Sequence, residues 1–190
     1  HAFAVGTLTR WIGSASIGGT PVTTITPVSA TQVKLTVPAG AHTGQISVTN
    51  VVSTGASTGT FKVLPKITGF SPGSAPRGDV VDITGATFTT PLTVKFGTVV
   101  ATTVTVDPDE STIHATVPDT ATTNKLSVTT AAGTATSATS LTVILGPVIS
   151  GFSPTSAAVG SVVTVSGSNL TGIDSASIGG TAVTTITPVS

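Results

Sequence analysis

The chain has 190 residues, of which only 7% are charged, and its 7 Lys and Arg balance its 7 Asp and Glu. Since charged residues make up about 25% of an ordinary soluble domain, the chain cannot carry the basic face on which nucleic-acid binding depends. The absence of Cys excludes a disulfide framework, a thiolate nucleophile and a zinc–thiolate site. No apolar run approaches the roughly 18 residues of a membrane helix, so we expect no membrane span. The first residue is His rather than Met, and we interpret the chain as a processed or excerpted one.

Internal repeats divide the chain into modules of about 80 residues. The segment ITGFSP at 67–72 returns as ISGFSP at 149–154. The sixteen residues SASIGGTPVTTITPVS at 14–29 return at 175–190 with one difference, Pro21 in the first copy and Ala182 in the second. The repeats therefore predict a tandem array rather than one large domain.

The repeat offsets place three modules along the chain. Residues 1–65 form a module that lacks its first strand, because FAVG at 3–6 lines up with VTVSG at 163–167. Residues 66–146 form a complete module, and residues 147–190 form the first half of a third. Two interpretations follow: the chain is a window on a longer array, or neighbouring copies complete each other's sheets by strand exchange. We favour the window, because the two partial modules duplicate strands.

Apolar residues alternate with polar ones inside each module, which is typical of strands with one buried face. In the first module Val33, Leu35 and Val37 alternate with Lys34 and Thr36. The same period-two pattern recurs at 81–85, 92–96, 113–117, 126–128 and 163–167. Clusters of Gly, Pro, Ser and Asp punctuate these runs at short intervals, and no segment has a sustained helical period. We therefore expect an all-β chain whose modules are β-sandwiches.

Several of these motifs together resemble a known family. The pattern I-[ST]-G-F-S-P is followed by a strand that ends in Gly, VDITG at 81–85 or VTVSG at 163–167, and then by F-G or I-G-G and a T-V-P turn. This series is similar to the IPT/TIG domain, and the similarity extends over essentially the whole chain. The resemblance implies tandem immunoglobulin-like sandwiches, which occur in bacterial surface proteins, plexin-type receptors and some transcription factors.

The histidines give little support for an enzyme or a metal cofactor. His1 at the chain start could form a copper site with its terminal amine and a second His, but His42 lies in a turn and His114 lies on the outward strand face that Lys34 occupies in the previous module. Residues 1–65 contain no Asp or Glu that could orient His42. The sequence also lacks a G-x-S-x-G elbow and a metal-spaced His pair. We expect neither catalytic residues nor a cofactor, and interpret His114 as a solvated strand residue.

The only acidic cluster of the chain is Asp107, Asp109 and Glu110. Three carboxylates within four residues could bind Ca²⁺, which prefers oxygen ligands. The alternative is a hairpin turn in which Pro108 presets φ and the acids remain solvated. We favour the turn, because the equivalent segment of the preceding module, TPVSAT, has no acids.

Five residues are candidates for contacts between modules or chains. Arg10 and Trp11 replace the Thr and Gly of the third module, and Trp11 is the only Trp of the chain. Pro65 and Pro147 occupy equivalent junctions, where a fixed φ limits bending. Phe152, in the repeated ISGFSP segment, is the fifth candidate.

The sequence therefore predicts a structural repeat protein at the cell surface or outside the cell, acting as a stalk, adhesin or filament segment. Its expected partners are adjacent modules or copies of itself, with glycans or a host or cell surface as further candidates. One alternative function is a self-assembling filament subunit whose partial modules are completed by neighbouring chains. A second is a carbohydrate- or protein-binding surface module, for which six Phe and one Trp over three modules provide few stacking platforms.

Overall fold

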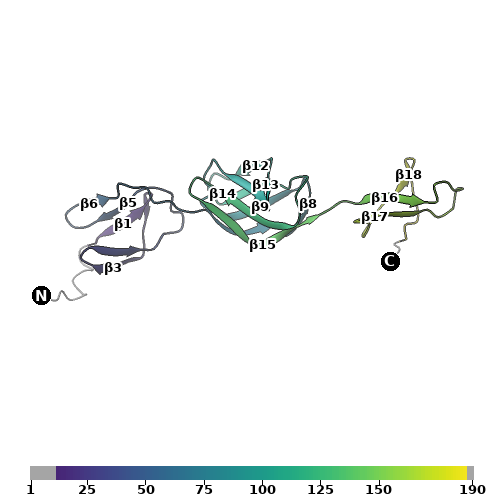
Figure 1. Ribbon diagram of the computed structural model, residues 1–190. Coiled ribbons are helices and arrows are strands. Elements are labelled where there is room, and N and C mark those ends of the chain that lie inside the picture. The colour runs from purple at the N-terminus through teal and green to yellow at the C-terminus, as the bar shows by residue number, and fades with distance from the viewer. Residues whose placement is uncertain (1–11, 188–190) are drawn as a thin grey trace. The chain divides into compact units, whose positions relative to one another are not determined.

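The computed structural model describes residues 12–187, and their regular secondary structure consists of β-strands alone (Figure 1). The predicted all-β class is therefore confirmed. The chain divides into two compact units that meet between Val143 and Ile144. Within the described range there is no helix long and apolar enough to span a membrane.

Residues 66–143, in the first unit, form two sheets around one core. Their nine strands are β7 (Lys66–Ser71), β8 (Ser74–Pro76), β9 (Val80–Ala86), β10 (Thr93–Phe96), β11 (Val99–Val100), β12 (Val104–Val106), β13 (Thr112–Thr116), β14 (Asn124–Thr129) and β15 (Thr134–Ile144). One sheet has the order β12-β13-β9-β7 and the other the order β11-β10-β14-β15-β8. We call this sandwich the middle module.

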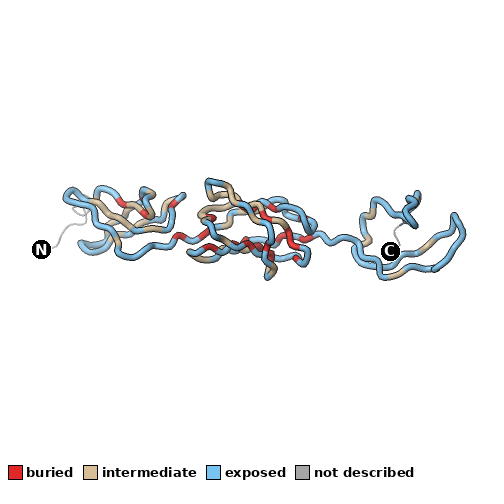
Figure 2. The backbone as a smooth tube through the Cα atoms, turned by 90° about the horizontal axis from the view of Figure 1, so that it is seen from above, coloured by how far each residue is buried: buried red, intermediate tan, exposed pale blue. Residues whose placement is uncertain are grey.

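The core of the middle module is built by the predicted alternation. Ile83 and Ile113 from one sheet and Leu126 and Val128 from the other have no exposed surface. Phe88, in the loop after β9, is also fully buried against them. Each such side chain contributes about 1.5–3 kcal/mol when it leaves water. Figure 2 shows the buried segments of this module in red.

The first strands of the middle module join both sheets. Strand β7 pairs with β9 in one sheet, whereas β8 pairs with β15 in the other. Just before β8, the Gly73 carbonyl accepts a hydrogen bond of 3.1 Å from the N–H of Thr142 on β15. The segment that enters the module is therefore bonded directly to the strand that leaves it.

Residues 12–63 form a second, smaller sandwich-like module in the same unit, here called the first module. Its strands are β1 (Ser14–Ile17), β2 (Thr20–Pro21), β3 (Ile25–Ser29), β4 (Gln32–Leu35), β5 (Ile46–Thr49) and β6 (Thr54–Ala56). They form a sheet of order β2-β1-β5-β6 and a separate β3-β4 ribbon. Its core contains five buried residues, Ala15, Ile17, Val22, Ala41 and Val63.

Strand β4 is less buried than the alternation predicts. Val33 and Leu35 are half-buried and Val37 is 44% exposed, whereas their repeat counterparts in the middle module are fully buried. The reason is the strand order: β13 lies between β12 and β9, but among the described residues β4 pairs only with β3. The expectation of a buried face at 33–37 is therefore corrected to a partly open one.

The second unit contains four short strands, β16 (Val148–Ser153), β17 (Thr164–Ser168), β18 (Ser177–Ile178) and β19 (Thr181–Ala182). They form two hairpins, β16-β17 and β18-β19. None of its described residues is buried, and Figure 2 shows this part of the chain almost entirely in pale blue. Phe152, a predicted contact residue, is 57% exposed.

Candidate functional site

The acidic cluster lies in the turn that joins β12 to β13. The N–H of Glu110 donates a hydrogen bond of 2.9 Å to the carbonyl of Asp107, which closes the turn. Glu110 has a φ of 56°, in the left-handed region that few residues other than Gly adopt. The segment is thus the turn that Pro108 indicated.

Asp109 is held by its own turn. Its carboxylate accepts a bond of 2.8 Å from the Ser111 hydroxyl and one of 3.1 Å from the Ser111 N–H. The side-chain bond first, and then the backbone bond, lower the pKa of Asp109 below its ordinary value of 3.8, because they stabilise the anion. This carboxylate serves as a turn-stabilising acceptor.

Asp107 belongs to a second, longer-range cluster with His114 and Asp82. The Nδ1 of His114 lies 2.6 Å from Oδ1 of Asp82, and its Nε2 lies 3.2 Å from Oδ1 of Asp107. The hydrogen bond to Asp82, followed by that to Asp107, raises the pKa of His114 above 6.5. His114 is therefore not the independent solvated side chain that the sequence indicated, although it remains partly exposed.

Asp82 was not predicted from the sequence as a partner of His114, because the two are 32 residues apart. The signal lies in the strand register, since β9 and β13 pair Asp82 directly with His114. Both are outward members of alternating strands, so a correct pairing of the strands identifies the contact.

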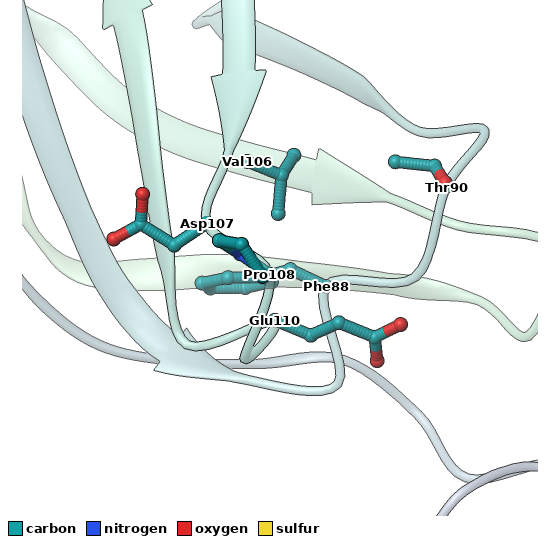
Figure 3. A pocket seen from close by; sticks show the side chains of 6 residues that line it. All are labelled: Phe88, Thr90, Val106, Asp107, Pro108 and Glu110. Carbon is teal, nitrogen blue, oxygen red and sulfur yellow. The ribbon is translucent and has the colours of Figure 1, made fainter.

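Glu110 borders a hollow of about 220 Å³ beside the same turn. The hollow is lined by Phe88, Thr90, Val106, Asp107, Pro108 and Glu110. Figure 3 shows the carboxylates of Asp107 and Glu110 directed away from each other. Oε2 of Glu110 is buried and has no hydrogen-bond partner among residues 12–187. Nδ1 of His42 in the first module lies 3.6 Å from this oxygen, too far for a hydrogen bond.

The calcium alternative requires the three acids to converge, and the geometry separates them. Asp109 bonds Ser111, Asp107 faces His114, and Glu110 borders the hollow. Within residues 12–187, no group of three His, Asp or Glu side chains is arranged to hold a metal ion. The cluster is thus three separate carboxylate environments on one turn.

The remaining predicted contact residues have different environments. Pro65 is buried, whereas Pro147 at the equivalent junction is exposed, as is Phe152. Leu64 beside Pro65 occupies the space next to Gly133, where an added Cβ would lie 2.6 Å from Cδ2 of the leucine. The predictions for His1, Arg10 and Trp11 lie outside the described residues.

No family model and no curated protein matches the chain. Among solved structures, it is similar to SGBP-B from a complex xyloglucan utilization locus in Bacteroides uniformis, with 18% identity over 70% of this chain and 42% of the other and a TM-score of 0.39. SGBP-B of the Bacteroides ovatus mixed-linkage glucan utilization locus, solved with a mixed-linkage heptasaccharide, matches with 16% identity over 75% and 40% and a TM-score of 0.36. The plexin A4 extracellular region matches with 14% identity over 77% and 14% and a TM-score of 0.41.

These similarities are too low to carry an argument about function. The chain spans about two fifths of the length of the two SGBP-B proteins. The function must therefore be argued from the chain's own residues.

Proposed function

We propose that this chain is a stretch of a cell-surface or extracellular protein, in which modules of the IPT/TIG type act as tension-resisting spacers without enzyme activity. The observation that carries the proposal is the direct bonding of β8, the second strand of the middle module, to its last strand, β15. A spacer must keep its length when its two ends are pulled. In this module residues 74–143 cannot extend until the hydrogen bonds between β8 and β15 break, and β7 adds a second set of bonds, to β9, at the N-terminal end.

The core reinforces this resistance. Leu141 and Val143 on β15 are buried in the same cluster as Ala75 on β8, so strand separation also exposes apolar surface. Exposure of this surface costs about 25 cal/mol per Å². The length of the spacer is then maintained by one cooperative module rather than by a flexible linker.

Two groups of the polar cluster, His114 and Asp109, are already engaged by neighbouring groups, which supports the non-enzymatic part of the proposal. A general base needs a free nitrogen or carboxylate within reach of a substrate proton. Both ring nitrogens of His114 face carboxylates, and Asp109 is engaged by Ser111. These groups hold strands and a turn together.

A second candidate function is glycan binding, and the hollow beside Glu110 is the observation that favours it. The unpartnered Oε2 of Glu110 and the hydroxyl of Thr90 can bond sugar hydroxyl groups. However, Phe88 in this hollow has no exposed surface, so it offers no ring face for a sugar to stack on. On the contacts of the chain itself we keep the spacer as the main proposal, with glycan binding as its alternative.

Single-molecule force spectroscopy of the whole chain tests the spacer. We expect one discrete unfolding event of about 25 nm, the length that some 80 residues release when they extend. Gradual extension without such an event would contradict the proposal. Calorimetric titration with a xyloglucan oligosaccharide and a mixed-linkage heptasaccharide tests the alternative. Binding that is lost in E110Q would favour the glycan function, with D109N on the same turn as the control.

A further inference from the structure

The turn between β12 and β13 contains a peptide bond that is chemically unlike its neighbours, the bond from Asp107 to Pro108. Because the proline nitrogen carries no N–H, this bond is a tertiary amide. Its nitrogen takes up a proton and leaves more readily than that of an ordinary peptide bond. Asp107 is also the only Asp or Glu of the chain that directly precedes a proline.

The turn itself polarises the carbonyl group of this bond. The N–H of Glu110 donates a hydrogen bond of 2.9 Å to the carbonyl oxygen of Asp107. A backbone N–H in this position stabilises the negative charge that develops on the oxygen when a nucleophile adds to the carbonyl carbon. The scissile carbonyl therefore has one oxyanion-stabilising donor already in place.

The nucleophile belongs to the same residue. The carboxylate of Asp107 reaches the carbonyl carbon of its own peptide bond by rotation about its side-chain and backbone bonds, closing a small cyclic anhydride. Since both reacting groups belong to one residue, no translational freedom is lost in the approach. The side chain is 47% exposed, so the packed core does not prevent this rotation.

His114 lies beside this carboxylate as a proton donor. Its Nε2 is 3.2 Å from Oδ1 of Asp107, and its Nδ1 is 2.6 Å from Oδ1 of Asp82. The strands on either side of β13 bring Asp82 on β9 and the neutral Thr105 on β12 opposite the ring. The bond to Asp82 first, and then the bond to Asp107, raise the pKa of His114. The ring thus retains near neutral pH the proton that a leaving nitrogen needs.

A hollow of about 220 Å³, lined in part by Asp107, Pro108 and Glu110, provides room for water beside the bond. Figure 3 shows the carboxylates of Asp107 and Glu110 on either side of Pro108. Oε2 of Glu110 has no hydrogen-bond partner among residues 12–187, and Nδ1 of His42 is 3.6 Å from it. A carboxylate oxygen with a free acceptor position can take a proton from a water molecule.

We propose that the middle module cleaves its own chain between Asp107 and Pro108. The carboxylate of Asp107 adds to its own carbonyl carbon, and the C–N bond breaks as the Pro108 nitrogen takes a proton from His114. The products of this step are a cyclic anhydride at Asp107 and the free amine of Pro108. Water then opens the anhydride while Glu110 accepts its proton, and His114 regains a proton from solvent. The net reaction consumes one water molecule and needs no cofactor.

The cleaved module would consist of two pieces held together by strand pairing alone. Strands β7 to β12 precede the bond and β13 to β15 follow it, and the pairs β12-β13, β13-β9, β10-β14 and β15-β8 connect the pieces. The cleaved chain would keep its fold at rest and separate into two molecules when pulled. This single intramolecular step goes beyond the spacer role, and its readout, a covalent mass, does not depend on mechanical resistance.

Intact-mass spectrometry of the full 190-residue chain, incubated in the folded state at about pH 6, tests the proposal. We expect fragments 1–107 and 108–190, whose masses together exceed that of the chain by one water. The same chain in concentrated urea at the same pH should cleave several-fold more slowly, because it loses the contacts to His114 and Glu110. Absence of cleavage in the folded chain, or equal or faster cleavage in urea, would overturn the proposal.

Variants test the role of the histidine. H114Q should slow cleavage by about 100-fold, within the range of a general acid, whereas D109N on the same turn should cleave at the rate of the unmodified chain. That rate should fall as the pH rises through the raised pKa of His114, and D82N should move the fall to lower pH. Circular dichroism confirms that each variant is folded. An unchanged rate in H114Q, or a rate independent of pH, would contradict the mechanism.

Hydroxylamine identifies the anhydride. It should add to this intermediate and leave a hydroxamate at Asp107, the last residue of fragment 1–107. The chain has no Asn–Gly bond, which hydroxylamine would cleave without the anhydride. A fragment that ends in an ordinary carboxylate under these conditions would indicate direct attack by water and would overturn the assignment of Asp107 as the nucleophile.

Discussion

Asp82 and His114 face each other across β9 and β13, with 2.6 Å between Oδ1 of the aspartate and Nδ1 of the histidine. The other ring nitrogen of His114 lies 3.2 Å from Oδ1 of Asp107. With a carboxylate at each nitrogen, the ring can donate both hydrogen bonds only when both nitrogens carry a proton. The imidazolium is therefore the form that fits this environment.

This pair makes the stability of the middle module depend on pH. Asp82 first, and then Asp107, raise the pKa of folded His114 above the ordinary 6.5. The stabilisation is therefore fully present below pH 6.5 and is lost as the pH rises through the folded pKa. We expect the free energy of unfolding, measured in urea, to fall as the pH rises above about 6.5 and through the raised pKa of folded His114.

Variants separate this contribution from other titrations. H114Q should abolish the slope over this range. By NMR titration, D82N should lower the pKa of His114 more than D107N does, because the bond to Asp82 is the larger cause. High salt should weaken the effect, since the cluster is partly exposed. A His114 midpoint at or below 6.5 would contradict the assignment.

A second prediction concerns a buried serine that recurs at the same repeat position. The Ser137 hydroxyl accepts a bond of 2.9 Å from the N–H of Leu126 and donates one of 2.6 Å to the carbonyl of Thr139. It takes the place of a ladder bond at the bulge between β14 and β15. S137A leaves the Leu126 N–H buried without a partner, so it should cost about 1–3 kcal/mol in chemical denaturation.

The first module supplies the matched control. Ser57 makes the same two bonds, to the N–H of Ile46 and the carbonyl of Gly59, but at a more exposed site. S57A should therefore destabilise the first module by less than S137A destabilises the middle module, because water can reach the freed N–H of Ile46. Equal losses in the two variants would show that burial is not the deciding factor.

The alternation of apolar residues predicted well which segments are strands, because the alternation of side chains between the two faces of a strand depends only on the local backbone. The expected strand at 81–85 became β9, and that at 163–167 became most of β17. The burial of those strands was predicted less well. Val81 and Ile83 are buried while Val165 is exposed, although all occupy the same pattern, because burial also depends on the strand that pairs with each edge.

The polar cluster was only partly predictable for the same reason. The Asp107–Glu110 turn follows from Pro108 and neighbouring acids, which are local signals. The partners of His114 come from a distant strand, and local spacing does not reveal them. Ser57 and Ser137 were also missed, although both are serines at an offset of 80 residues and the repeat comparison could have identified them.

A third prediction follows from the close approach of β7 to β9 at Gly85. A Cβ at this position would collide with the carbonyl of Lys66. G85A should therefore destabilise the middle module by about 1–3 kcal/mol through overpacking, measured as a lower midpoint in urea. G73A is the control, since nothing lies within 4 Å of a Cβ there. A neutral G85A would mean that β7 can move aside without loss.

A fourth prediction compares two residues that occupy the same repeat position in different environments. Ile83 is fully buried between the two sheets of the middle module, whereas its counterpart Val165 is 45% exposed on β17. I83A removes core contacts and leaves a cavity, so it should cost about 2–5 kcal/mol. V165A in dilute solution should change stability by no more than about 0.5 kcal/mol, as surface substitutions do.

Hydrogen exchange can test both variants, because peptides that contain β9 and peptides that contain β17 differ in sequence and can be followed separately. In the unmodified chain, the amides of β9 should exchange far more slowly than those of β17, which lacks a buried face. I83A should accelerate exchange across residues 66–143 and leave residues 144–187 unchanged. Exchange of β17 as slow as that of β9 would contradict the prediction, because it would show that the exposure of Val165 does not reflect a less stable strand.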